Sequence, residues 1–123
     1  MRRNKRKIVF VDDDSSCLKS YKICMQGFEG FEKLYFLDPE KAYEYIKNSK
    51  DVALLVTDER MPNMSGHVLI NLVSTYCPAI LLSGQVESSI IDILPKGTQV
   101  LAKDGIREIQ IIKGRLSRLK GAA

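Results

Sequence analysis

Short apolar runs alternate with amphipathic segments along the whole chain. The runs are rich in β-branched and aromatic residues and are only a few residues long, which is typical of buried strands rather than helices. Most of them are continuously apolar, as expected for strands that are covered on both faces. The five runs, each predicted to form a β-strand, are 7–11, 32–36, 52–57, 79–82 and 99–102.

The segments between the runs carry apolar residues at helical spacing. The first helix is predicted to follow Ser15 or Ser16 as its N-cap. The second is predicted to begin at Asp38 and Pro39, which supply a cap and a first-turn proline. A short fourth helix is expected around 88–94. The third helix is marked by Val68, Leu69, Leu72, Val73 and Tyr76. The inner stripe of the fifth helix is set by Ile109, Ile112, Leu116 and Leu119.

This alternation of strands and helices predicts one α/β domain with a doubly wound parallel sheet. The chain has 123 residues, 45% of them apolar and 28% charged, which is ordinary for a single globular domain, and no linker or repeat divides it. We expect a basic arm at 1–6 and the fold at 7–120. No apolar run approaches the roughly 20 residues of a transmembrane helix, so no membrane span is expected.

The net charge of +4 is distributed unevenly along the sequence. Residues 1–7 carry +5 and residues 107–123 carry +4, whereas residues 8–106 carry −5. An acidic body with basic ends argues against a basic groove built into the fold, so a nucleic-acid partner is not expected. The basic arm is expected to be a solvated tail, and contact with an acidic partner, nucleic acid or a membrane surface is the alternative.

The three cysteines form no metal-binding or redox motif. Cys17, Cys24 and Cys77 cannot all be paired, and none of them lies in a C-x-x-C sequence. They are expected to be reduced and to pack as small apolar side chains, which is typical of a cytoplasmic protein.

Polar residues directly follow four of the predicted strands. Asp12 and Asp13 follow the first, Asp58 the third, Ser83 the fourth and Lys103 the fifth. Because the carboxyl ends of parallel strands share one edge of the sheet, we expect these side chains to meet there. Three carboxylates repel one another unless a cation joins them, and oxygen ligands suit Mg²⁺. With the lysine ammonium nearby, such a site could accept and hold a phosphoryl group.

The strand-end motifs resemble those of the response-regulator receiver domains of two-component signalling, over essentially the whole chain. Within that family the chain looks like the short, stand-alone members of chemotaxis type. The resemblance implies the flavodoxin-like fold, with five helices around a parallel sheet of strand order 2-1-3-4-5. The matching segments are Val11-Asp12-Asp13, Leu55-Val56-Thr57-Asp58, Met61-Pro62-Asn63-Met64-Ser65-Gly66, Leu81-Leu82-Ser83-Gly84 and Leu101-Ala102-Lys103.

The resemblance also implies a role for each residue of the site. Asp58 would be the phosphorylated aspartate. Asp13 and Asp58 would bind Mg²⁺ through their carboxylates, the backbone carbonyl of Arg60 would be a third ligand, and Asp12 would act through bound water.

Other polar residues are expected beside the acids. Ser83 would donate a hydrogen bond to a phosphoryl oxygen, and Lys103 would pair with another. Arg60 and Gln85, each two residues after a site residue, would flank the path of the hydrolytic water and alter the lifetime of the phosphoryl-aspartate. His67, the only histidine, is expected at the surface and outside the site.

By this resemblance the chain is expected to be a phosphorylation-dependent switch. A histidine kinase or phosphotransfer protein would phosphorylate Asp58, and a downstream protein would bind the side formed by the fourth strand, fourth helix, fifth strand and fifth helix. The chain would catalyse only its own phosphoryl transfer and dephosphorylation, and would not be an enzyme for other substrates. Ile106 and Ile111, off the inner stripe of the last helix, would suit a partner or a weak homodimer.

A receiver-like interaction module that works without phosphorylation is the alternative. It is favoured by Val100, which stands where the family usually has an aromatic residue, and by Asp104, which stands where it usually has proline. A cis peptide bond without proline costs about 2.5–4 kcal/mol, so the family's cis bond after Lys103 is not expected. The three acids and the lysine favour phosphorylation.

Overall fold

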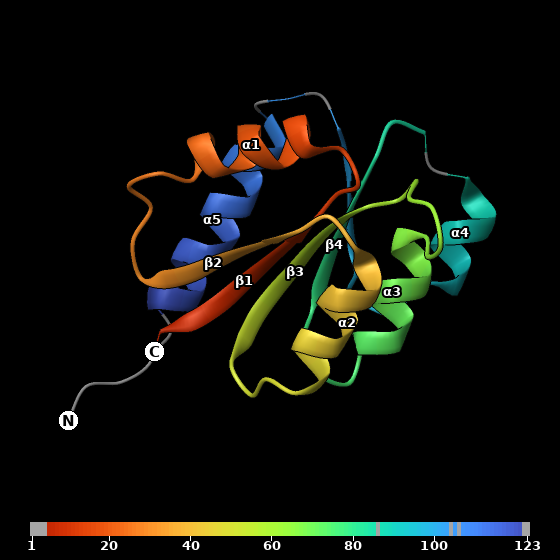
Figure 1. Ribbon diagram of the computed structural model, residues 1–123, viewed down its shortest axis with the longest axis horizontal. Coiled ribbons are helices and arrows are strands. Elements are labelled where there is room, and N and C mark those ends of the chain that lie inside the picture. The colour runs from red at the N-terminus through yellow and green to blue at the C-terminus, as the bar shows by residue number, and fades with distance from the viewer. Residues whose placement is uncertain (1–4, 86, 104, 106, 122–123) are drawn as a thin grey trace.

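The computed structural model describes residues 5–85, 87–103, 105 and 107–121. Strands and helices alternate through this part of the chain, as the pattern of apolar runs predicts (Figure 1). In chain order they are β1 (Arg6–Val11), α1 (Ser15–Cys24), β2 (Phe31–Phe36), α2 (Pro39–Lys47), β3 (Val52–Asp58), α3 (Gly66–Val73), β4 (Ala79–Ser83), α4 (Ser88–Ile93), β5 (Gln99–Ala102) and α5 (Arg107–Gly121).

The five strands form one parallel sheet in the order β2-β1-β3-β4-β5, which confirms the expected flavodoxin-like topology. Helices α1 and α5 cover one face of the sheet, and α2, α3 and α4 cover the other (Figure 1). All strands point the same way, so their carboxyl ends, and the residues that follow them, lie along one edge. None of the described helices is both long and apolar enough to cross a bilayer.

Each face of the sheet has its own buried cluster of apolar side chains. On the side of α1 and α5, strand residues such as Phe10 and Leu54 pack against Tyr21 and Ile112. Burying a side chain of this size contributes about 1.5–3 kcal/mol, so these two clusters supply most of the driving force for folding. The cluster on the other side consists of Val9, Val11, Ala42, Ile46, Val52, Leu55, Leu69, Ile70, Val73, Cys77, Ala79 and Leu81.

The starts of two helices show how the sequence sets local structure. Asp38 caps α2 through a hydrogen bond from the backbone N–H of Glu40 (2.9 Å), and Pro39 is the first helical residue, as predicted. The predicted cap of α1 is wrong. Asp14, rather than Ser15 or Ser16, accepts the backbone N–H of Ser16 (2.9 Å), because the helix begins one residue earlier than the serines would allow.

Only part of the apolar pattern that marks α3 is buried. Leu69 and Val73 of that pattern are buried, and so is Ile70. Val68, Leu72 and Tyr76 are 41%, 43% and 47% exposed, although they belong to the same apolar pattern. Residues 66–77 contain no Asp, Glu, Lys or Arg, so apolar residues occur all round this segment and periodicity cannot select its inner face.

The last helix has the inner face that its spacing predicts. Ile109, Ile112 and Leu116 are buried, and Leu119 packs against the same cluster. Ile111 is half-buried on the other side of α5. Ile106 and Asp104 lie outside the described residues, and so do residues 1–4 of the basic arm. The strand β1 begins at Arg6, so the end of the expected arm is already part of the sheet.

Candidate functional site

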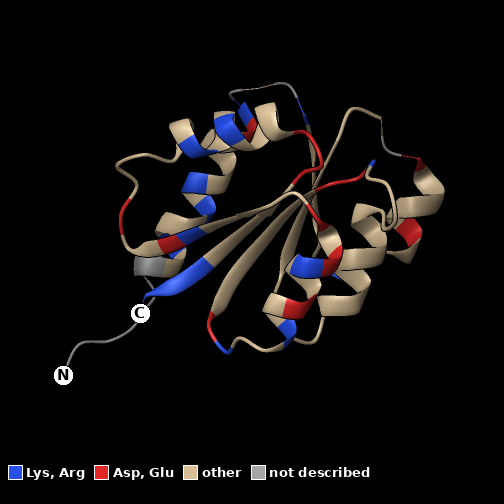
Figure 2. Cartoon of the chain, viewed as in Figure 1, with Lys and Arg blue, Asp and Glu red and all other residues tan. Residues whose placement is uncertain are grey.

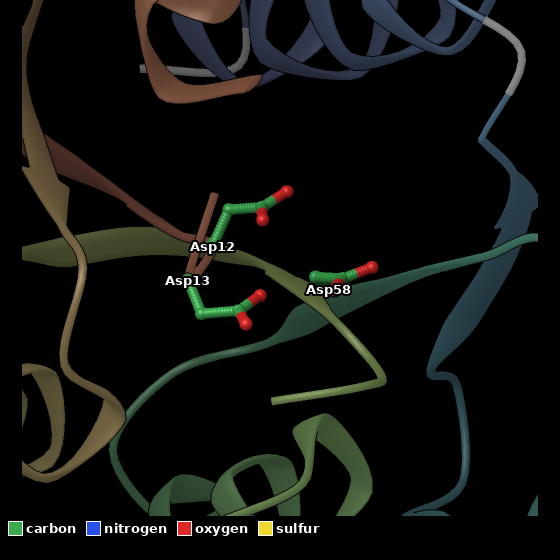
Figure 3. Close-up of side chains that lie close together, drawn as sticks. All are labelled: Asp12, Asp13 and Asp58. Carbon is green, nitrogen blue, oxygen red and sulfur yellow. The ribbon is translucent and has the colours of Figure 1, made fainter. Parts of the chain in front are cut away.

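The three aspartates predicted from the strand ends lie together at the carboxyl edge of the sheet. Asp12 and Asp13 follow β1, and Asp58 is the last residue of β3, the neighbouring strand. Figure 3 shows the three side chains projecting from these two strand ends. One carboxylate oxygen from each residue lies within 4.8 Å of the others. The parallel pairing of β1 and β3 therefore concentrates three negative charges at one point.

Lys103 balances part of this charge. Its Nζ donates to Asp12 Oδ2 at 2.7 Å and to Asp58 Oδ1 at 3.2 Å. Burial by itself would lower the lysine pKa, but the hydrogen bond to Asp12 and the negative charges of Asp12 and Asp58 outweigh it and raise the pKa above its ordinary value. Lys103 is therefore a fixed internal cation that connects the end of β5 to the ends of β1 and β3.

Whether a divalent cation fits the site depends on which carboxylate oxygens are free to bind it. Asp12 is 1% exposed, and both its oxygens are engaged, one with Lys103 and the other with the backbone N–H of Asp14 (3.0 Å). Asp13 is exposed, so its carboxylate faces solvent and is accessible to an ion. Three carboxylates and one ammonium leave a charge of about −2, and an all-oxygen donor set of that charge suits Mg²⁺. The residues present thus fit the expected ion.

Asp58 is partly withdrawn from water, and its ionised form is disfavoured. Burial is the main cause, the negative charge of Asp12 adds to it, and Lys103 opposes it, so the net effect is a raised pKa. A carboxylate in this state is held near other negative charges without full solvation. Adding positive charge at the site will favour its ionised form.

We expect Asp58→Asn to be more stable than the native chain when Mg²⁺ is absent. Because the pKa of Asp58 is raised on folding, folding loses stability as the pH rises from the unfolded value near 3.8 through the folded value. The gain should be present at neutral pH and should vanish well below pH 3.8, where the Asp58 side chain is neutral in both the folded and the unfolded chain. Urea unfolding at a series of pH values with EDTA measures it. No difference in stability between the two proteins at pH 7, or the same difference at neutral and strongly acidic pH, would contradict it.

Ser83 lies beside Asp58, at the end of the neighbouring strand β4. Its side chain is buried, and its hydroxyl donates to the backbone carbonyl of Gln85 at 2.7 Å. A surface hollow of about 420 Å³ opens here and is lined by Asp58, Arg60, Ser83, Gly84 and Gln85. Arg60 and Gln85, which are predicted to flank the path of the hydrolytic water, both line this hollow. Asp58 is therefore approachable from solvent on the side where these two long side chains lie.

A second pair of polar side chains, Glu59 and His67, lies directly after β3, and sequence reasoning missed it. Glu59 is only 8% exposed, and its Oε2 lies 2.7 Å from Nδ1 of His67. Its Oε1 accepts the backbone N–H of His67 at 2.9 Å, at the start of α3. His67 is expected at the surface; its side chain is 23% exposed and is held by the buried carboxylate of Glu59. No periodic signal links two residues eight apart across a loop, so only the fold brings them together.

Gly66 packs directly against β3, the strand that ends at Asp58. A Cβ atom at this position would lie 2.2 Å from the backbone oxygen of Asp58 and 2.8 Å from a methyl group of Leu81. The backbone N–H of Gly66 also donates to the carbonyl of Glu59 at 2.9 Å. Together with the Glu59–His67 pair, this contact fixes both ends of the loop that connects β3 to α3.

Val100 and the three cysteines, also singled out from the sequence, are not part of the cluster of Asp12, Asp13 and Asp58. Val100 is half-buried in β5 and packs against the cluster on the side of α2 and α3. Cys77 is buried, and Cys17 and Cys24 are half-buried in α1. The described cysteines form no disulfide, as expected.

The structure resembles solved receiver domains over nearly its whole length. No family model and no curated protein sequence matches the chain. A response regulator receiver domain protein from Methanospirillum hungatei superposes with a TM-score of 0.76 at 21% identity and covers 98% of this chain and 100% of that one.

Two other solved structures agree. The signal receiver domain of an HD domain-containing protein from Pseudomonas fluorescens gives a TM-score of 0.76 at 17% identity, covering 92% of this chain and 94% of that one. The receiver domain of a Francisella response regulator gives 0.70 at 22% identity, covering 91% and 99%. Topology, strand-end chemistry and these superpositions lead to one conclusion: the chain has the fold of a CheY-like response-regulator receiver domain.

Proposed function

We propose that this chain is a phosphoacceptor response regulator, in which Asp58 receives a phosphoryl group from a histidine kinase or a phosphotransfer protein. The observation that carries the proposal is the convergence of Asp12, Asp13, Asp58 and Lys103 at one sheet edge, beside a hollow that leaves Asp58 approachable. Mg²⁺, held by the carboxylates of Asp13 and Asp58 and the backbone carbonyl of Arg60, with Asp12 acting through bound water, would neutralise phosphoryl oxygens when bound.

Each side chain of the site would have its own role in phosphoryl transfer. An Asp58 carboxylate oxygen would attack phosphorus as the bond between phosphorus and the donor histidine nitrogen breaks, giving an acyl phosphate and a free imidazole. Lys103, already 3.2 Å from Asp58 Oδ1, would pair with a phosphoryl oxygen and so exchange part of its contact with the carboxylate. Ser83 would have to release the carbonyl of Gln85 and turn its hydroxyl toward the phosphoryl group.

The changed loops would then select a separate protein. The side formed by β4, α4, β5 and α5 is suited to this, because Ile91 and Ile93 of α4 are 50% and 55% exposed. A weak homodimer could use the same side. We also propose that the chain acts in the cytoplasm and is not an enzyme for external substrates. The reaction it would catalyse is phosphoryl transfer to and from its own Asp58.

The alternative, an interaction module that works without phosphorylation, has specific support. The hydroxyl of Ser83 is directed to a backbone carbonyl, and Val100 is not an aromatic residue that could follow it inward. Asp104, the other residue that favours this alternative, lies outside the described part of the chain.

Incubation with acetyl phosphate and Mg²⁺, followed by intact-protein mass spectrometry, separates the two functions. The native chain is expected to gain the mass of one phosphoryl group, and Asp58→Asn is expected to gain none. Asp92→Asn, an exposed acid on α4, is the matched control and should be phosphorylated like the native chain. No gain in the native chain, or an equal gain in Asp58→Asn, would rule out Asp58 as the acceptor.

A further inference from the structure

The two helical layers carry different charge. Among the side chains described in α1 and α5 there is one acid, Glu108, and it is 1% exposed. Helices α2, α3 and α4 contain both acidic and basic residues. The acids are Glu40, Glu44 and Asp92, and the bases are Lys41 and Lys47. Figure 2 shows this difference between the two sides of the sheet. The basic residues described in α1 and α5, here called the basic layer, are Lys19, Lys22, Arg107, Lys113, Arg115 and Arg118.

The surface of the basic layer is polar as well as basic. Among the described residues of α1 and α5, Ile23 is the one large apolar side chain that is strongly exposed. The other strongly exposed ones lie on or beside α2, α3 and α4, and they are Leu37, Val68, Leu72, Tyr76, Ile91 and Ile93. The basic layer thus offers charge and hydrogen-bond donors, with little that could enter a bilayer.

Two arginines of the basic layer share a hollow near the start of β5. Arg115 and Arg118 line it together with Thr98 and Gln99, and Nη1 of Arg115 donates to Oε1 of Gln99 at 3.1 Å. No described carboxylate forms an ion pair with either guanidinium. Burial and the charge of Arg118 both lower the pKa of Arg115, so the two cations are held close without a counter-charge from the described chain. An anionic group in this hollow would relieve their repulsion.

We propose that the basic layer binds duplex nucleic acid through the phosphodiester backbone, with one phosphate seated between Arg115 and Arg118. Guanidinium groups suit phosphate because they offer paired N–H donors as well as charge. α1 and α5 present no exposed aromatic ring among their described residues, so bases cannot stack on them and binding should be independent of sequence.

This proposal revises the expectation that nucleic acid is not a partner. That expectation rests on charge counted along the sequence, where residues 8–106 carry −5. In the fold, Lys19 and Lys22 of α1 join the bases of α5 on one side of the sheet, while Asp12, Asp13 and Asp58 lie at its carboxyl edge.

Fluorescence anisotropy with a labelled 20-base-pair duplex of arbitrary sequence tests the proposal on the full chain. If about four phosphates are neutralised, affinity should fall about 10²-fold between 50 and 200 mM salt. Arg115→Gln/Arg118→Gln should bind at least tenfold more weakly at 50 mM salt and show a shallower salt dependence. Lys41→Gln/Lys47→Gln, which removes the same charge from exposed positions on α2, should bind within twofold of the native chain.

Two further measurements separate the basic layer from the N-terminal arm and from a membrane surface. A chain with Arg2, Arg3 and Lys5 replaced by Gln should keep its dependence on Arg115 and Arg118, and loss of all binding in that variant would assign the effect to the arm. Vesicles containing 30% phosphatidylserine should bind more weakly than the duplex. Preference for vesicles, no duplex binding at 50 mM salt, or equal binding by the double arginine variant would each overturn the proposal. Circular dichroism of each variant confirms that it is folded.

Discussion

Replacing Lys103 with methionine is expected to lower the free energy of unfolding by about 2–4 kcal/mol when Mg²⁺ is absent. Asp12 is 1% exposed and its Oδ2 accepts a hydrogen bond from Lys103, so the variant leaves a buried carboxylate without its cation. Asp58 loses the same partner, and the two carboxylates then repel each other. Methionine retains most of the volume of the lysine stem, so the loss reports on charge rather than on a cavity.

The dependence on Mg²⁺ and on pH makes this prediction specific. Bound Mg²⁺ should restore part of the lost stability, because it supplies positive charge at the same carboxylates. The lysine pKa is raised on folding, so its contribution is fully present below the unfolded value of 10.5 and is lost as the pH rises through the folded value. The stability difference should therefore be constant from neutral pH to about pH 10.

Urea unfolding followed by circular dichroism, with EDTA and with Mg²⁺, measures both effects. Lys41→Met on α2 is the matched control, since Lys41 is exposed, and it should change stability by less than about 0.5 kcal/mol. In a double-mutant cycle, Asp12→Asn should remove most of the cost of Lys103→Met. Additive effects of the two substitutions would show that the pair does not stabilise the fold.

Replacing Gly66 with alanine is expected to destabilise the fold by about 2–3 kcal/mol. The new Cβ would overlap the backbone oxygen of Asp58, which belongs to the central strand β3 and cannot rotate away as a side chain could. Relief requires α3 to move from the sheet, and that movement would also disturb the hydrogen bond from Gly66 to the carbonyl of Glu59. The same shift should weaken Mg²⁺ binding, because it acts directly on Asp58.

Gly114 provides a control, because its replacement with alanine is expected to raise the stability of the fold rather than lower it. Gly114 lies inside α5, where a Cβ would meet only the end of the Arg118 side chain at 3.8 Å. Gly114→Ala should stabilise the protein by about 0.5–1 kcal/mol, since alanine is the better helix former. Urea unfolding of both variants and calorimetric titration with Mg²⁺ measure the effects. Native stability in Gly66→Ala would show that α3 is not held against β3 as described.

Much of the candidate site could be predicted from the sequence because it depends on strand ends. Asp12, Asp13, Asp58 and Lys103 each follow or end an apolar run, and parallel strands carry such residues to one edge whatever the details of packing. The cap and first proline of α2 were also predictable from the sequence, because Asp38 and Pro39 affect only the backbone next to them in the chain.

Other features depend on contacts between distant segments. The Glu59–His67 pair forms across the loop before α3, and neither residue type indicates a partner eight positions away. Ser83 could be assigned to the site, but the direction of its hydroxyl toward Gln85 depends on how the loop after β4 turns.

Local sequence is enough to specify five parallel strands with acids at one edge, because apolar runs and the residues that end them are properties of short segments. Packing against the sheet, in contrast, selects which face of α3 is buried, since Val68, Leu72 and Tyr76 are as apolar as the residues that pack inside. Packing also sets where the charge lies. Counted along the chain, the bases gather at the ends, whereas folding places α1 beside α5 on one face of the sheet and gathers their lysines and arginines into a single layer. Charge acts through space, so only the packing of helices far apart in sequence could produce that layer.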